Sequence, residues 1–226
     1  MVDILNVRDC APILLALPLK GAPLSFDQLE EHSLRVSEMS FPTKSHVKAK
    51  NRRDSSGRLW TQFSLSKSKD EPPNSYSQVL DPVSGFRIIL IDERKIAYRL
   101  PLQMTGEAKF AFLGPADPAE AHHNWKVEKS HLGVRQIEGE EFEGTLIVQA
   151  AEDNDAIRST LEEWRSERLK LIGNLIWSNP DAEHRVGIEN LSRGEPEQIH
   201  FQIPADYQII DVPISTASPG ESSAEA

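Results

Sequence analysis

The sequence has very little cysteine and no long apolar run. Cys10 is the only cysteine among 226 residues, so no disulfide can form within the chain and no cysteine cluster can hold a metal. The longest apolar stretch, CAPILLALPL at 10–19, is shorter than the roughly 20 residues that a transmembrane helix needs. We therefore expect that the protein is not an integral membrane protein.

Cations are also scarce. Lys and Arg number 25 against 35 Asp and Glu, which gives a formal charge of -10. A net field of this sign repels phosphate and argues against nucleic acid as a partner. The exception is a basic segment at 44–58, which reads as solvated strand faces or as a surface for an acidic protein partner. Its cations are Lys44, Lys48, Lys50, Arg52, Arg53 and Arg58.

Aromatic residues make up only 7% of the chain, so we expect one domain with a modest core. Residues 32–212 are predicted to form this β domain. The N-terminal segment 1–31 is expected to be a degenerate export signal or a partly ordered strip. The small, polar and acidic tail 213–226 lacks the apolar surface needed to offset ordering entropy, which predicts disorder.

Short segments with period-two alternation predict antiparallel strands. The sequence RRDSSGR at 52–58 combines Asp and Ser, which favour turn entry, with Gly57, which tolerates positive φ. We therefore expect a hairpin of 44–53 and 58–66. In its second arm, Leu59 and Phe63 share one face and Trp60 lies on the other.

A second hairpin is predicted at FRIILI (86–91), DERK (92–95) and IAYRL (96–100). FRIILI has little polar alternation, which indicates a central strand covered on both faces. The sequence predicts a long loop with one helical turn at 101–124 and a shorter loop at 152–157. The segment 192–212 is predicted to be extended and rich in turns. Further strands are predicted at 125–131, 133–139, 141–149, 159–166, 168–177 and 183–190, with a helix over 155–172 as an alternative to the strands there.

About ten strands in one antiparallel sheet twist too strongly to stay flat, so the sheet must curl. The predicted fold class is mainly β, a single large curved antiparallel sheet that forms a half-barrel, with the loop 101–124 or a short helix against its concave face. An apolar ligand would then meet the side chains that line the hollow. The predicted lining residues are Leu59, Phe63, Phe86, Ile88, Tyr98, Trp164, Leu171 and Trp177.

The polar clusters do not make a convincing catalytic site. His122, His123 and His131 lie near Asp117 and Glu120, but no metal-binding spacing on one regular element is present, and exposed loop histidines are the simpler interpretation. No Gly-x-Ser-x-Gly elbow occurs, and the carboxylates around 140–143 read as solvated. We predict no enzyme activity, no cofactor and no metal, and keep a metal-dependent hydrolase at 122–131 only as a remote alternative.

Trp60 stands beside the basic segment in the predicted register. An exposed indole next to Arg or Lys can form a binding surface. The predicted interaction surface therefore comprises Lys48, Lys50, Arg52 and Trp60.

The order of motifs resembles a family of uncharacterised exported bacterial β-rich proteins of the acidobacterial type. The resemblance covers about residues 45–212 and lies in turn signals and strand anchors. Ile88 or Ile89 stands where that family has Tyr, and the sequence has no clean signal peptide. The motifs are RDSSGR, DPVSGFRIILIDERKIAYRL, IEGEEFEGTLIV, TLEEWRSERLKLI and NLSRGEPEQIHFQIPADYQII.

More distantly, the sequence is similar to the superfamily of outer-membrane lipoprotein carriers (LolA/LolB-like). That similarity implies a curved sheet that holds an acyl chain, in a periplasmic or otherwise exported protein; a cytoplasmic location is the alternative. Two hypotheses stay open besides the remote hydrolase. One is a lipid- or acyl-binding domain, and the other is a cell-envelope interaction module that uses the basic segment 44–58 to meet an acidic protein.

Overall fold

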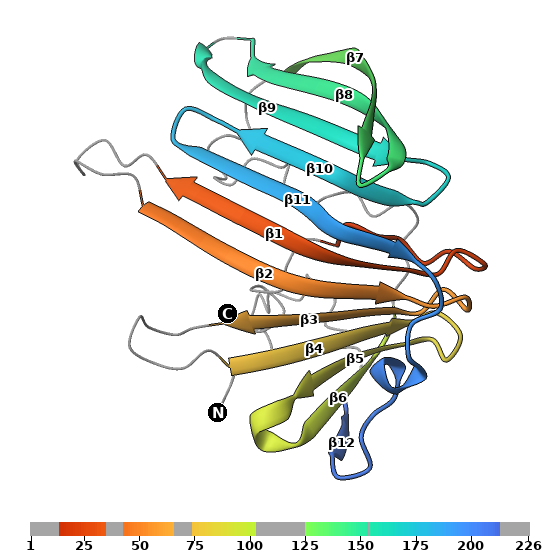
Figure 1. The fold of residues 1–226 in the computed structure, drawn as a ribbon. Coiled ribbons are helices and arrows are strands. Elements are labelled where there is room, and N and C mark those ends of the chain that lie inside the picture. Colours follow the sequence, from red (N-terminus) through yellow and green to blue (C-terminus); the bar gives the residue numbers. More distant parts are fainter. Residues whose placement is uncertain (1–13, 35–42, 66–73, 103–124, 153, 213–226) are drawn as a thin grey trace, which may run out of the picture.

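A single sheet of twelve strands dominates the computed structural model, which describes residues 14–34, 43–65, 74–102, 125–152 and 154–212. The strand order is β12-β6-β5-β4-β3-β2-β1-β11-β10-β9-β8-β7 (Figure 1). Neighbours are antiparallel except β12, which runs parallel to β6. The predicted fold class, mainly β with one large antiparallel sheet, is confirmed.

The bounds of the strands follow the turn signals of the sequence closely in the first half of the chain. Within the described ranges, no helix is long and apolar enough to span a membrane. The strands are β1 (Leu24–Leu34), β2 (Thr43–Arg53), β3 (Leu59–Leu65), β4 (Asn74–Asp81), β5 (Phe86–Ile91), β6 (Ile96–Pro101), β7 (Trp125–Ile137), β8 (Glu140–Ala151), β9 (Asn154–Ser166), β10 (Leu171–Ser178), β11 (Ala182–Arg193) and β12 (Gln208–Asp211), with short 3-10 turns η1 (Asp92–Arg94) and η4 (Gln198–Phe201).

The two predicted hairpins are confirmed. At the first, Asp54 Oδ1 accepts the backbone N–H of Arg58 at 2.8 Å, and Gly57 has a φ of 86°. At the second, Lys95 closes η1 with a φ of 50°. Residues 88–91 of β5 are buried, so this strand is covered on both faces, as its uniform apolar sequence predicts.

The strand β1 was not predicted. It begins at Leu24, whereas the sequence indicated strands only from about residue 32. Leu24 and Phe26 are buried on one face, and the next two buried side chains on that face are Gln28 and Glu30. Because these two are polar, the apolar alternation that marks a strand stops after two residues.

Three other local predictions are wrong. β9 begins at Asn154, inside the predicted loop 152–157, and the helical alternative for 155–172 is replaced by β9 and the start of β10. The two strands predicted at 125–131 and 133–139 form one strand, β7, with a register shift between His131 and Gly133. Gly133 has a φ of 90°, so it permits a bulge where the sequence suggested a break.

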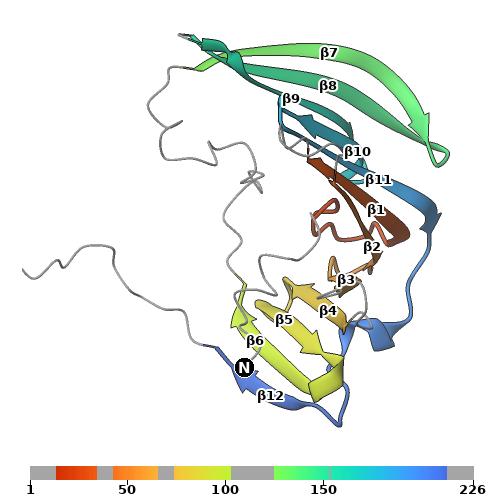
Figure 2. The same ribbon diagram turned by 90° about the vertical axis from the view of Figure 1, so that its left-hand side faces the viewer.

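The sheet curves strongly, and its two faces are covered differently. Figure 2 shows the hollow of the sheet on one side and η4 on the other. Phe201 of η4 packs with Trp60, Val79 and Ile88, so these side chains lie on the convex side, called here the outer face. Side-chain alternation then places Phe63 and Ile89 on the opposite, concave face. The predicted loop 101–124 falls almost wholly outside the described residues, as does the tail 213–226.

Three apolar clusters stabilise the described residues. The central cluster lies mainly at β1, β9, β10 and β11, with Leu59 of β3 and Phe142 of β8, and it includes Leu15 and Ala16, so part of the apolar run near the N-terminus is core. The inner apolar patch, on the concave face of β2–β6, consists of Ala49, Phe63, Tyr76, Ile89 and Ile91, with Tyr98 and Leu100 packed against it. The outer cluster consists of Trp60, Val79, Ile88, Leu90, Ala97 and Phe201, with Phe86, Ile203 and Tyr207 packed against it.

Gly173 of β10 provides a test of this packing. A Cβ at this position would lie 2.6 Å from Phe142 Cε1, whereas a Cβ at Gly187 of β11 would meet its nearest atom at 3.6 Å. We predict that Gly173→Ala lowers the free energy of unfolding by about 1–3 kcal/mol through overpacking. Gly187→Ala is the matched control and should change it by less than about 1 kcal/mol. Urea unfolding measures both; equal effects would contradict the packing of Phe142 on Gly173.

Candidate functional site

A row of buried polar side chains crosses the concave face of the sheet. These side chains lie between the central cluster and the inner apolar patch, and they come from β11, β1, β2, β3 and β4 in turn. All are less than one-tenth exposed. We call this row the polar belt: His184, Glu30, Gln28, Asn51, Thr61 and Gln78.

Hydrogen bonds connect most of the belt. Thr61 Oγ1 donates to Asn51 Oδ1 at 2.8 Å. Asn51 Nδ2 donates to Gln28 Oε1 at 3.0 Å, and Gln28 Nε2 donates to Glu30 Oε1 at 2.6 Å. Farther along, Gln78 Oε1 accepts a hydrogen bond from Arg87 at 2.8 Å. Since a buried polar group without a partner costs about 1–3 kcal/mol, these bonds are what allow polar residues to occupy a buried face.

At its β11 end the belt terminates in two stacked histidines. The rings of His32 and His184 are 3.7 Å apart between centroids, with an interplanar angle of 21°. Their Nε2 atoms lie 3.6 Å and 3.4 Å from Glu30 Oε2. Burial, and next the neighbouring His184, lower the pKa of His32 below its usual 6.5. The neutral imidazole is therefore favoured at His32.

The structure divides the predicted lining residues between the two faces. Register places Leu59, Phe63 and Tyr98 on the concave face, and Trp177, opposite His184, also faces it. Phe86 and Ile88 instead belong to the outer cluster.

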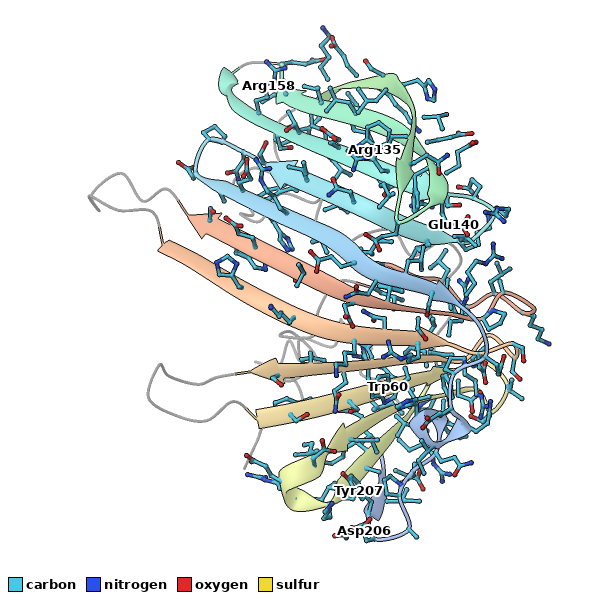
Figure 3. All side chains as sticks on the ribbon, in the orientation of Figure 1. Trp60, Arg135, Glu140, Arg158, Asp206 and Tyr207 are labelled. Carbon is cyan, nitrogen blue, oxygen red and sulfur yellow. The ribbon has the colours of Figure 1, made fainter. Side chains whose placement is uncertain are left out.

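Two other predicted lining residues, Trp164 and Leu171, lie away from the inner apolar patch. Trp164 pairs with Gly144, and the guanidinium of Arg135 lies 4.0 Å from the centroid of its ring (Arg135 is labelled in Figure 3). Leu171 is buried in the central cluster beside Ala16. About half of the predicted lining set thus lies on the concave face, divided between the central cluster and the inner apolar patch.

The predicted interaction surface is only partly exposed. Lys48 and Lys50 are exposed on the outer face and Arg52 is half-buried. Trp60, labelled in Figure 3, is only 7% exposed, which corrects the prediction of an exposed indole. The ring of His200 covers it at 4.5 Å between centroids. This cover comes from a part of the chain about 140 residues away, which hairpin alternation cannot indicate.

Two further cations of the basic segment, Arg53 and Arg58, are used within the fold. Arg53 is fully buried and donates to the carbonyls of Ala22 at 2.8 Å and Leu17 at 2.9 Å. Burial lowers the pKa of Arg53 to about 10. Arg58 forms an ion pair with Asp54 at 2.6 Å. Arg53 thus holds the segment 17–22 against the sheet. The surface of the basic segment therefore carries fewer exposed positive charges than the sequence suggested.

The clusters considered for catalysis do not assemble in the described residues. His122 and His123, with Asp117 and Glu120, lie outside them, and His131 is exposed on β7. Glu140 Oε1 accepts a hydrogen bond from Arg193 at 3.2 Å, and its other oxygen contacts Arg168. Glu140 is therefore engaged in ion pairs between strand ends.

The polar belt was not predicted from the sequence, although one signal was present. Glu30 and His32 are spaced i, i+2, which places both on one face if the segment is a strand. His184 joins them only because β1 pairs with β11, and a pairing between segments about 150 residues apart leaves no local trace in the sequence.

No protein-family model matches the chain, and no curated protein matches it. Among solved structures, the fold is similar to the MucA/MucB complex of Pseudomonas aeruginosa, with 16% identity, coverage of 84% of this chain and 59% of that chain, and a TM-score of 0.40. It is also similar to a LolA superfamily protein of Nitrosomonas europaea, with 8% identity, coverage of 84% of this chain and 98% of that chain, and a TM-score of 0.36. A third similar structure is LprF of Mycobacterium bovis, with 10% identity, coverage of 80% of this chain and 90% of that chain, and a TM-score of 0.33.

The names of these structures include the carrier superfamily that the sequence distantly resembles. This chain spans about three fifths, 59%, of the length of the chain it matches in the MucA/MucB complex. At such identities and TM-scores the likeness concerns the arrangement of strands and says nothing about ligand, partner or location.

The hydrogen bond between Asn51 and Thr61 can be tested by a double-mutant cycle. We predict that Asn51→Leu lowers the free energy of unfolding by about 1–3 kcal/mol and Thr61→Val by about 1 kcal/mol, since each leaves buried partners unpaired. The double variant should lose less than the sum, by about 0.5 kcal/mol or more. Urea unfolding gives all values. As a control, the effect of Ser64→Ala, at an exposed position of β3, should simply add to that of Asn51→Leu. If the effect of Thr61→Val also simply added to that of Asn51→Leu, the hydrogen bond would be contradicted.

His200 should make the cover of Trp60 sensitive to pH. Burial, and next the cation of Arg52, lower the pKa of His200 below its usual 6.5. The unfolded chain therefore binds the proton more readily, so this contribution to stability is complete above pH 6.5 and is lost as the pH falls through the lowered pKa. We predict that the stability of the wild type falls more steeply on acidification than that of His200→Gln, measured by urea unfolding at several pH values. Parallel curves would contradict the prediction, because they would show that folding does not lower the pKa of His200.

Proposed function

We propose that this chain is a non-enzymatic, exported β domain that binds an apolar ligand, an acyl chain, on its concave face. The observation that supports this most directly is the composition of the inner apolar patch. In the described part of the chain, every member of the patch belongs to the sheet itself. On the outer face, Phe201, Ile203 and Tyr207 from the C-terminal segment pack on the strands. The members of the inner apolar patch are buried as well, so an acyl chain would have to insert among them.

The energetics favour a ligand of this kind. Transfer of an acyl chain from water to an apolar surface stabilises a complex by about 0.8 kcal/mol per buried methylene. Ten methylenes would contribute about 8 kcal/mol before the entropy lost on association is subtracted. An acyl chain can follow a curved apolar strip, which a rigid planar ligand cannot.

The neighbouring polar groups suit the polar end of such a ligand. Arg87 lies in register between Leu80 and Leu100, and so faces the hollow at the margin of the inner apolar patch. A guanidinium matches the geometry of a carboxylate. The Gln78 amide, which accepts a hydrogen bond from Arg87, holds this guanidinium in place. A fatty acid therefore provides a suitable probe.

A fluorescent fatty acid titrated into the full chain tests the proposal, with two adjacent isoleucines as a matched pair. Ile89 is 3% exposed in the inner apolar patch, and Ile88 is 8% exposed in the outer cluster. Ile89→Thr should weaken binding about tenfold, or about 1.4 kcal/mol. Ile88→Thr should destabilise the fold to a similar degree and leave the affinity unchanged.

A titration without an emission change would contradict the proposal, and so would equal losses of affinity in both variants. The same titration separates the interaction-module alternative. Reversal of the exposed Lys48 and Lys50 to Glu should leave fatty acid binding unchanged, because both lie on the outer face. Loss of capture of an acidic protein in that variant, together with no fatty acid binding in the wild type, would favour the module instead.

A further inference from the structure

Glu30, His32 and His184 bring three metal-ligand atoms to one point on the concave face. One nitrogen from each histidine and one oxygen from the glutamate all lie within 4.8 Å of one another. Glu30 Oε2 is 3.4 Å from His184 Nε2 and 3.6 Å from His32 Nε2. Ligand atoms around a tetrahedral zinc ion, with bonds of about 2.0–2.1 Å, lie about 3.3–3.4 Å apart. The distances from Glu30 to both histidines therefore already match those around an ion, and the two stacked rings need to splay apart so that both nitrogens point to it.

The sheet itself produces this spacing. His32 of β1 is directly opposite His184 of β11 in the antiparallel register. Glu30 precedes His32 by two residues and so shares its face. Figure 1 shows β1 and β11 side by side in the middle of the sheet. The site therefore rests on rigid central strands, which hold ligands more firmly than loops do.

The buried histidine has a ring nitrogen without a hydrogen bond. His184 is 7% exposed, and its Nε2 has no hydrogen-bond partner among the described residues. This nitrogen lies 3.4 Å from Glu30 Oε2, the same oxygen that lies 3.6 Å from His32 Nε2. A bound cation satisfies both nitrogens in their neutral form, which is the form that binds metals.

The polar belt orients the carboxylate. Glu30 Oε1 accepts the hydrogen bond from Gln28 Nε2, and Gln28 is in turn held by Asn51. This leaves Oε2 toward the histidines. Hydrogen bonds of this kind, from groups around the ligands, orient metal-binding carboxylates and raise affinity. The chain of amides gives a function to polar residues that otherwise interrupt an apolar face.

We propose that Glu30, His32 and His184 bind a divalent transition-metal cation of the zinc class. Two imidazoles and one carboxylate suit zinc better than calcium or magnesium, which prefer oxygen ligands. Because the His32 side chain is 42% exposed, the ion stays reachable from solvent and keeps room for water or a further ligand. The site is independent of the proposed acyl binding and does not require it.

Zinc titration by calorimetry on tag-free, metal-stripped full-length protein tests the site. The wild type should bind one zinc ion per chain. His32→Gln and Glu30→Gln should each weaken binding by about tenfold or more. His131→Gln is the matched control, because His131 is an exposed strand histidine far from the site in the strand order. It should leave the affinity unchanged.

A second measurement guards against variants that fail to fold. Zinc should raise the thermal unfolding temperature of the wild type and of His131→Gln, because a ligand that binds only the native state stabilises it. It should not raise that of His32→Gln, whose far-UV circular dichroism should remain native, since His32 is half-exposed. No heat of binding in the wild type would overturn the proposal. Binding that persists in both site variants but is lost in His122→Gln/His123→Gln would do the same.

Discussion

The antiparallel pairing of β1 with β11 is the constraint on which the rest of this structure depends. Strands β2–β6 form one meander and β7–β11 another, and β1 lies between β2 and β11. Its register runs from Leu24 opposite Arg193 to Leu34 opposite Ala182, with one irregularity between Ser25 and Asp27. Without this contact the two meanders would be separate sheets with two additional edges.

That pairing also explains why polar side chains lie in the middle of the concave face. Gln28 and Glu30 of β1 face inward because Leu24 and Phe26 on the same strand do, and the irregularity in this pairing adds its extra residue to β11, so the alternation of β1 is unbroken. Partners from β2 and β11 then satisfy them. The belt separates two buried apolar regions, the central cluster and the inner apolar patch toward β6, so a single sheet carries two distinct apolar regions on its concave side.

The sequence predicted what local chemistry determines. Asp54 with Gly57 and the residues 92–95 specify tight turns, and the uniform apolar run of β5 specifies a strand covered on both faces. The side-chain pattern did not reveal which of Ile88 and Ile89 faces the hollow, because the one polar residue of the run, Arg87, lies on the same concave face as Ile89 and so does not mark a solvent face.

The site was less predictable, since it depends on contacts between distant segments. Trp60 is covered by His200 and Phe201, and His184 reaches Glu30 only through the central pairing of strands. Gln28 and Glu30 also removed the apolar alternation that would have marked β1. The residues most relevant to function were thus those that made their own strand hard to recognise.

The most direct test of this account is a nuclear Overhauser measurement between the imidazole ring protons of His32 and His184. The two rings are stacked with centroids 3.7 Å apart, so a strong cross-peak is expected, assigned by its loss in His32→Gln and in His184→Gln. Its absence in the folded wild type, with both rings assigned, would contradict the register of β1 on β11 and with it the arrangement of the concave face.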